Sequence, residues 1–141
     1  MKSLAEKMRI TEQDKVLILH APQDWEDVSL QGADTSKRAG VLYDHVLCFV
    51  YKQAELAKGY PSLKSLIHDQ GKIWVIWPKG RRLQTDLDLD SVVKTVYSLG
   101  MVESVNLAVD QTWTALKFTW PKPGKEYSNH HAELIRDPEQ K

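Results

Sequence analysis

The chain of 141 residues carries 19 basic and 19 acidic side chains, so its formal net charge is zero. A balanced chain has no overall field to draw it toward nucleic acid, an acidic membrane surface or a charged substrate. The length corresponds to one domain, and a domain of this size buries roughly two thirds of its unfolded surface. We therefore expect one folded unit, in which any charged partner is bound by a local patch.

Targeting signals and cysteine content favour a cytoplasmic location. The first ten residues carry charges throughout, with no apolar core of signal-peptide length, and no later run approaches a membrane span. The only cysteine, Cys48, lies inside an apolar run and has no partner for an intrachain disulfide. We interpret it as a small core residue rather than a reactive thiol.

The amino-terminal third predicts a helix, a strand and a loop. Leu4, Ala5 and Met8 share one face of a short amphipathic helix. Residues 15–20 form an apolar run without glycine or proline, which predicts the first buried strand. Residues 23–43 are largely polar and contain two glycines, so we expect a loop there.

The middle of the chain predicts a strand, a helix and a second strand. Residues 45–51 are apolar and predict a strand, whereas residues 61–70 have helical spacing behind a proline. Gly71 suits the left-handed position just past a helix. Residues 73–77 are continuously apolar and stop at Pro78, which predicts the central strand, covered on both faces.

A helix and a hairpin follow after a loop over residues 78–87. The predicted helix has an apolar stripe formed by Leu89, Val92, Val93, Val96 and Tyr97. Asp86 or Asp88 suits its cap, and Gly100 ends it. Residues 102–109 and 114–120 are strand-like, and their short separation predicts an antiparallel pair.

Strands that alternate with helices imply a parallel sheet, to which the hairpin adds one reversed strand. The expected fold is therefore an α/β three-layer sandwich around a mostly parallel five-stranded sheet with one antiparallel strand. We assign residues 1–120 to this Rossmann-like domain. Residues 121–141 are polar and contain two early prolines, and we expect a tail there.

This order of elements resembles the second half of a class I methyltransferase fold. Residues 15–21 resemble the first strand of that fold, and residues 43–77 resemble its fourth and fifth strands. Four segments are also similar to those of a family of short bacterial proteins classed as a domain of unknown function, over residues 10–120: Tyr43-Asp44, Trp77-Pro78-Lys79, Thr85-Asp86-Leu87 and Val109 to Trp113. Gln111 stands where that family usually has an acidic residue, so the likeness implies no carboxylate pair there.

The cofactor elements of the parent fold are missing from the sequence. That fold uses a glycine-rich turn after its first strand, because only glycine lets the backbone approach the ligand closely. No glycine lies between Lys15 and Gly32, and residues 23–43 are too few for the usual two helices and two strands. The likeness therefore implies a truncated, degenerate scaffold whose sheet begins at residues 15–20. We expect no cofactor and no S-adenosylmethionine-dependent methyl transfer.

If a ligand binds, the carboxyl ends of the parallel strands are the expected rim. The candidate ligand-binding residues there are His20, Asp24, Tyr51, Trp77, Lys79, Arg81, Arg82 and Asp86. Each also has a structural interpretation. His20 suits a proton carrier or a hydrogen-bonded strand end, Asp24 a turn and Asp86 a helix cap, while the basic cluster from Lys79 suits an anion or a solvated loop.

No pattern in the sequence indicates a catalytic or metal site. The adjacent His130 and His131 lack further ligands at metal spacing, and no nucleophile elbow or phosphate loop occurs. We therefore expect a non-catalytic binding or regulatory module that interacts with a second copy or another protein. The alternative is a small enzyme or sensor for an anionic metabolite, gripped by the cluster from Lys79 to Arg82, with His20 transferring a proton. Nucleic-acid binding ranks third, because one loop supplies too few phosphate contacts.

Overall fold

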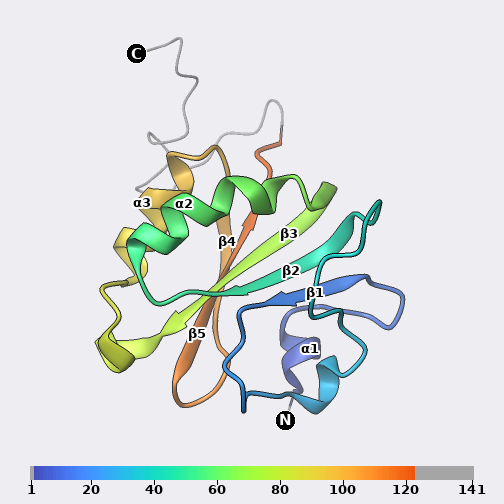
Figure 1. Cartoon of the computed structure of the whole chain (residues 1–141), viewed down its shortest axis with the longest axis horizontal. Helices are drawn as coiled ribbons and strands as arrows, with labels where there is room; N and C mark the ends of the chain where they lie inside the picture. Colours follow the sequence, from blue (N-terminus) through green and yellow to red (C-terminus); the bar gives the residue numbers. More distant parts are fainter. Residues whose placement is uncertain (1, 123–141) are drawn as a thin grey trace.

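In the computed structural model, which describes residues 2–122, five strands form one sheet in the order β1-β2-β3-β5-β4 (Figure 1). The strands are β1 (Val16–Leu19), β2 (Tyr43–Phe49), β3 (Ile67–Pro78), β4 (Val102–Ala108) and β5 (Trp113–Thr119). The helices are α1 (Leu4–Lys7), α2 (Gln53–Lys64) and α3 (Leu89–Tyr97), with short 3-10 helices η1 (Val28–Leu30) and η2 (Lys79–Gln84). Strands β1, β2 and β3 are parallel, and β5 is antiparallel to both β3 and β4. The α/β fold class is confirmed; the expected tail lies almost entirely outside the described residues.

The central strand is β3, as its continuous apolar run predicts. It pairs with β2 on one side and with β5 on the other, and residues 73–77 are all buried. Ile73, Val75 and Trp77 join the apolar cluster beneath α2 and α3, whereas Trp74 and Ile76 join the cluster beneath α1 and η1. Figure 1 shows α2 and α3 on one side of the sheet and α1 on the other. Both faces of the strand are therefore covered.

Helix α2 and the start of β3 lie earlier in the chain than predicted. The expected helix over residues 61–70 is instead Gln53–Lys64, with Pro61 inside it, and β3 already begins at Ile67. The helix starts at Gln53 because Glu55 Oε1 accepts the backbone N–H groups of Tyr51 and Lys52, at 2.8 and 2.9 Å. Gln53 N donates to Asp86 Oδ1 at 2.8 Å.

The expectation that Gly71 ends a helix is wrong, because Gly71 lies buried within β3. A Cβ atom there would come within 2.5 Å of Ile67 Cβ and 3.0 Å of the Tyr43 carbonyl oxygen. The glycine is thus needed for close packing. The predicted helix at α3 is confirmed, with Asp88 Oδ1 accepting from Ser91 N at 2.9 Å and Gly100 in the left-handed region at φ 92°.

Strand β1 is the last named strand on its side among residues 2–122. The segment between β1 and β2 is mainly a loop, as expected, apart from η1. It places Asp34 against the outer edge of β1, where Ile18 N donates to Asp34 O and Asp34 N donates to Val16 O, both at 2.8 Å. Within these residues no helix is long and apolar enough to cross a membrane.

His45 is a buried titratable group in β2. Its side chain is 3% exposed; its Nδ1 accepts from the Trp74 indole N–H at 3.1 Å, and its Nε2 lies 3.5 Å from Asp14 Oδ2. Burial lowers the pKa of His45 from 6.5 to about 4, although the nearby Asp14 carboxylate acts in the opposite direction. The imidazole is therefore neutral at pH 7.

This pKa predicts a loss of stability in mild acid. Between pH 6.5 and 4 the unfolded chain takes up a proton on His45 that the folded chain does not, so the free energy of unfolding falls as the pH drops. The loss reaches up to ~3 kcal/mol, at 1.36 kcal/mol per pKa unit. Replacement His45→Asn keeps an acceptor near Trp74 but does not titrate, and should flatten the profile. Urea unfolding at several pH values checks this, and equal slopes for both proteins would contradict it.

Candidate functional site

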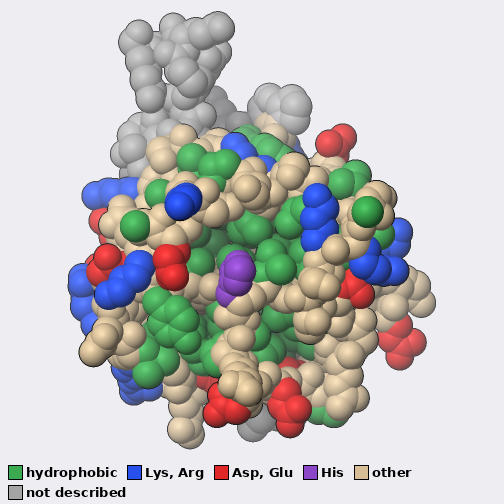
Figure 2. Space-filling view, in the orientation of Figure 1, with side chains coloured by type: hydrophobic (Ala, Val, Ile, Leu, Met, Phe, Trp, Pro, Cys, Tyr) green, Lys and Arg blue, Asp and Glu red, His purple; other side chains and the backbone are tan. Residues whose placement is uncertain are grey.

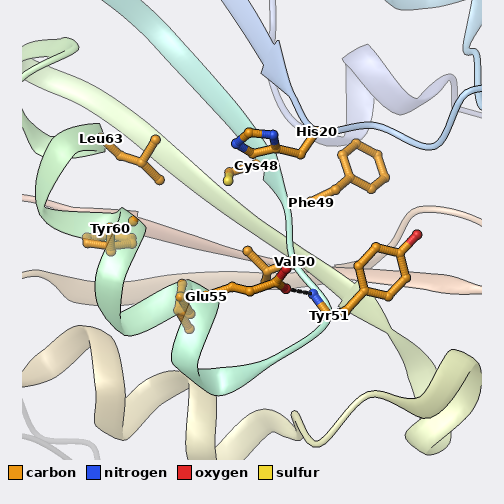
Figure 3. Close-up of a pocket in the computed structure, with 10 residues that line it drawn as sticks. His20, Cys48, Phe49, Val50, Tyr51, Glu55, Tyr60 and Leu63 are labelled. Carbon is orange, nitrogen blue, oxygen red and sulfur yellow. Dashed lines mark hydrogen bonds between the residues drawn. The ribbon is translucent and has the colours of Figure 1, made fainter.

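A pocket of about 230 Å³ lies at the carboxyl ends of β1 and β2, against α2 (Figure 3). Its lining comprises His20, Cys48, Phe49, Val50, Tyr51, Glu55, Leu56, Gly59, Tyr60 and Leu63. Most of these side chains are apolar, and Figure 2 shows apolar side chains exposed in the middle of this face, between α2 and β1. The pocket therefore combines a largely apolar wall with a polar mouth.

His20 is the polar side chain at the mouth. It follows β1 directly, with its backbone in the left-handed region at φ 62°, and it is exposed. In Figure 3 its imidazole extends from the end of β1 toward α2. Among residues 2–122 the ring has no hydrogen bond or ion pair. It is therefore available to a ligand as a donor or an acceptor.

Helix α2 forms the opposite wall, and a glycine keeps that wall open. Apart from its chain neighbours and the backbone of the helix, no atom lies within 4 Å of the position that a Cβ of Gly59 would occupy. A glycine inside a helix lowers the stability of the helix by about 0.5–1 kcal/mol relative to alanine. The open space in the pocket wall therefore reduces the stability of α2. Tyr60 lies one helical turn after Leu56 and fills the inner wall of the pocket. Its hydroxyl lies 3.1 Å from Met101 Sδ.

Three other ionisable side chains of the lining, Cys48, Tyr60 and Glu55, are held neutral or engaged in hydrogen bonds. Burial raises the pKa of the Cys48 thiol to about 12 and raises the pKa of the Tyr60 hydroxyl well above 10. The Glu55 carboxylate accepts from the backbone at the start of α2, as described above. His20 and Tyr51 are thus side chains of this lining whose polar atoms form no hydrogen bond with the described residues.

On the α1 face, aromatic rings fill the carboxyl end of the sheet. Trp25 packs edge-on against Phe49 with ring centres 4.9 Å apart, and Phe49 packs against Trp113 at 5.0 Å. Tyr51 lies 5.4 Å from Trp113. The Trp25 indole N–H donates to Asp110 Oδ2 at 3.3 Å, which ties the loop after β1 to the turn between β4 and β5. These contacts leave the rings as packing rather than as an open surface.

The basic cluster lies at a different pocket. Trp77, Lys79 and Arg81 line a space of about 270 Å³ between η2, α3 and β4. Arg81 Nη2 is 2.8 Å from Asp88 Oδ2, and Arg82 Nη1 donates to the Gln111 carbonyl oxygen. Both guanidinium groups are therefore engaged within the protein, and Lys79 is half-buried.

The eight residues expected at the rim are thus divided. His20 and Tyr51 share the pocket at α2, while Trp77, Lys79 and Arg81 share the pocket at η2. Asp86 accepts from the start of α2, whereas Arg82 and the exposed Asp24 line neither pocket. The sequence analysis missed Glu55, Gly59 and Tyr60 as pocket residues, because it predicted the helix over residues 61–70 rather than over Gln53–Lys64. A glycine inside this helix was the one signal that could have indicated them. No group of three possible metal ligands occurs in the described part of the chain.

Comparison with known proteins relates the fold, and only the fold, to methyltransferases. No family model and no curated protein matches the chain. The DhpI–SAH complex has a TM-score of 0.53 and 9% identity, covering 77% of this chain and 78% of that one. Ribosomal protein L11 methylase from Lactobacillus delbrueckii subsp. bulgaricus has a TM-score of 0.50 and 11% identity, covering 84% and 63%.

A structure of magnesium protoporphyrin IX methyltransferase (ChlM) from Synechocystis PCC 6803 with bound SAM has a TM-score of 0.48 and 15% identity, covering 63% of this chain. This chain spans 45% of that protein and less than two thirds of the L11 methylase. The likeness to DhpI and the L11 methylase confirms the expected methyltransferase-like fold.

The contacts of Asp86 and Asp24 predict different effects of substitution. Asp86→Ala removes the acceptor of Gln53 N at the start of α2 and should destabilise the protein by about 1 kcal/mol. Asp24→Ala, the matched control at an exposed position, should change stability by less than about 0.5 kcal/mol. Urea unfolding measures both. Equal values for the two variants would contradict a capping role for Asp86.

Proposed function

We propose that the chain is a non-catalytic binding module on a degenerate methyltransferase-like scaffold, with its ligand in the pocket between α2 and the ends of β1 and β2. The packing of Trp25 across Phe49 at the carboxyl end of the sheet is the observation that carries this proposal. Ligands of open α/β sheets bind outside the carboxyl ends of the strands. A ring held there by Asp110 competes for that space.

The turn after β1 supports the same conclusion. A cofactor cradled by this turn needs glycine, because glycine has no side chain to keep the ligand away from the backbone. His20 occupies the first position of the turn with a left-handed backbone, a conformation that glycine adopts more easily. Its imidazole points instead across the pocket at α2 (Figure 3).

The lining of that pocket supports one class of ligand. Its volume of about 230 Å³ is below the roughly 300–1,000 Å³ of drug-sized sites but above the ~150 Å³ cavity that accepts benzene. Leu56, Tyr60 and Leu63 present apolar surface, and His20 supplies the hydrogen bond. The proposed ligand is therefore a compact, mostly apolar molecule with one hydrogen-bonding group.

The alternative, an enzyme or sensor for an anionic metabolite, has less support. An anion at the η2 pocket would have to displace Asp88 from Arg81 and the Gln111 carbonyl from Arg82. That exchange costs existing charge-assisted hydrogen bonds, so the net gain is small.

The likeness to the family of short bacterial proteins also belongs to this proposal. Its segments are used structurally here. The Tyr43 hydroxyl donates to Asp34 Oδ2 at 2.7 Å, and the Thr85 hydroxyl donates to the Tyr51 carbonyl oxygen at 2.5 Å. Asp110 Oδ1 accepts the backbone N–H groups of the turn at 2.8 and 2.9 Å. A family that shares these segments would share loop geometry rather than a reaction.

The proposal predicts that the cofactor of methyltransferases does not bind. Isothermal titration of the protein with S-adenosylmethionine and with S-adenosylhomocysteine should give no binding heat, because Trp25 and the side chain of His20 occupy the turn region. Binding of either compound with a micromolar dissociation constant would overturn the non-catalytic assignment.

The pocket itself predicts binding of small aromatic probes. Indole or phenol should raise the melting temperature of the wild type, and Gly59→Leu should abolish the shift by placing a side chain at the pocket wall. The control Ala57→Leu introduces the same residue at an exposed position of α2 and should keep the shift. His20→Ala should reduce it several-fold. An unchanged shift in Gly59→Leu would place the probe elsewhere, and no shift in the wild type would reject this ligand class.

A further inference from the structure

The two edges of the sheet differ in whether their outward backbone groups are paired. At the β1 edge, Asp34 occupies the backbone groups of Val16 and Ile18. At the other edge β4 pairs with β5, and no other segment within residues 2–122 pairs with its outer side. An open edge strand is a template for pairing with another chain, and proteins usually block it with lysine, proline or a covering loop.

Strand β4 carries few of these protective features. Residues 104–108 contain no charge and no proline. Val105, with 38% of its surface exposed, is one of the few exposed large apolar side chains among the described residues. The Lys7 ammonium donates to the Ala108 carbonyl oxygen at 3.2 Å, which covers only one end. A register irregularity between Glu103 and Asn106 limits regular pairing to the second half of the strand.

The outward backbone groups of that half can be assigned. Val109 N donates to the Trp113 carbonyl oxygen, so the backbone of Val109 faces β5. Backbone direction alternates along an antiparallel strand, which turns Ala108 and Asn106 outward, in agreement with the contact between Lys7 and the Ala108 carbonyl. Asn106 therefore lies at the middle of the open edge, with its backbone N–H and C=O both pointing away from the sheet.

We propose that β4 pairs antiparallel with β4 of a second copy about a two-fold axis at Asn106, joining two sheets edge to edge. Each residue on such an axis faces its own copy. Asn106 suits this place because its amide is both donor and acceptor. The pairing sets Val105 opposite Leu107 of the other copy and covers an exposed apolar side chain.

The charges near the strand are compatible with this register. Residues 104–108, which form the pairing segment, carry no charge, so no like charges face each other across the new pair. Glu103 Oε1 already accepts from the Tyr97 hydroxyl at 3.1 Å, which holds it toward α3. Self-pairing thus requires only that the exposed Lys7 side chain release one carbonyl.

Sedimentation velocity of the full chain over a range of concentrations tests the pairing. The wild type should form a dimer. Val105→Lys should be monomeric because a charge on an edge strand opposes pairing, whereas Val28→Lys, at a 79% exposed site on η1, should still dimerise. Circular dichroism should give the same fold for all three. A monomeric wild type, or a dimer that persists in Val105→Lys, would overturn the proposal.

A second variant tests the position of the axis. Asn106→Asp keeps the shape of the side chain but places two carboxylates opposite each other, and should raise the dimer dissociation constant several-fold at pH 7. Added salt should restore part of the affinity, because it screens exposed charges. A dimer of unchanged affinity in Asn106→Asp, or a wild type that pairs only with a strand of another protein, would reject self-pairing at this edge.

Discussion

The central constraint on this protein is that β3 must be covered on both faces by a chain with few helices. Residues 73–77 are buried on both sides. One apolar cluster therefore covers the face beneath α2 and α3, and a second covers the face beneath α1 and η1. The connection between β1 and β2 is a loop with one short 3-10 helix. Trp25 on the loop and Leu30 on η1 therefore supply the apolar contacts of this connection.

Both features of the carboxyl end follow from this short connection. On the α1 face, Trp25 reaches across Phe49 and fills the end of the sheet. On the other face, α2 covers β2 and β3 but leaves the end of β1 at the surface, so His20 and the α2 wall enclose a space instead of being buried. One short segment thus accounts for packed aromatic rings on one face and a pocket on the other.

Much of the fold could be predicted because its signals are local. The apolar run of β3 and the helical stripe of α3 depend on residues close in the chain, and so does the Asp88 cap. The start of α2 was missed although Glu55 supplies a local capping signal there, and the contact of its first amide with Asp86, far along the sequence, is not visible in a local pattern. Gly71 was misjudged for the same reason, since its role depends on the carbonyl of Tyr43 in another strand. His20, Tyr51 and Lys79 follow the carboxyl ends of β1, β2 and β3, but a sequence does not show which face of the sheet each side chain meets.

Cys48 gives the pocket a built-in reporter. It is the only thiol of the chain, lies in the pocket wall and is protonated at neutral pH, because burial raises its pKa to about 12. A reagent that alkylates it must first pass between α2 and the end of β1, and must also await a rare thiolate. The rate of that reaction therefore depends both on local opening of the structure around Cys48 and on ionisation of its thiol.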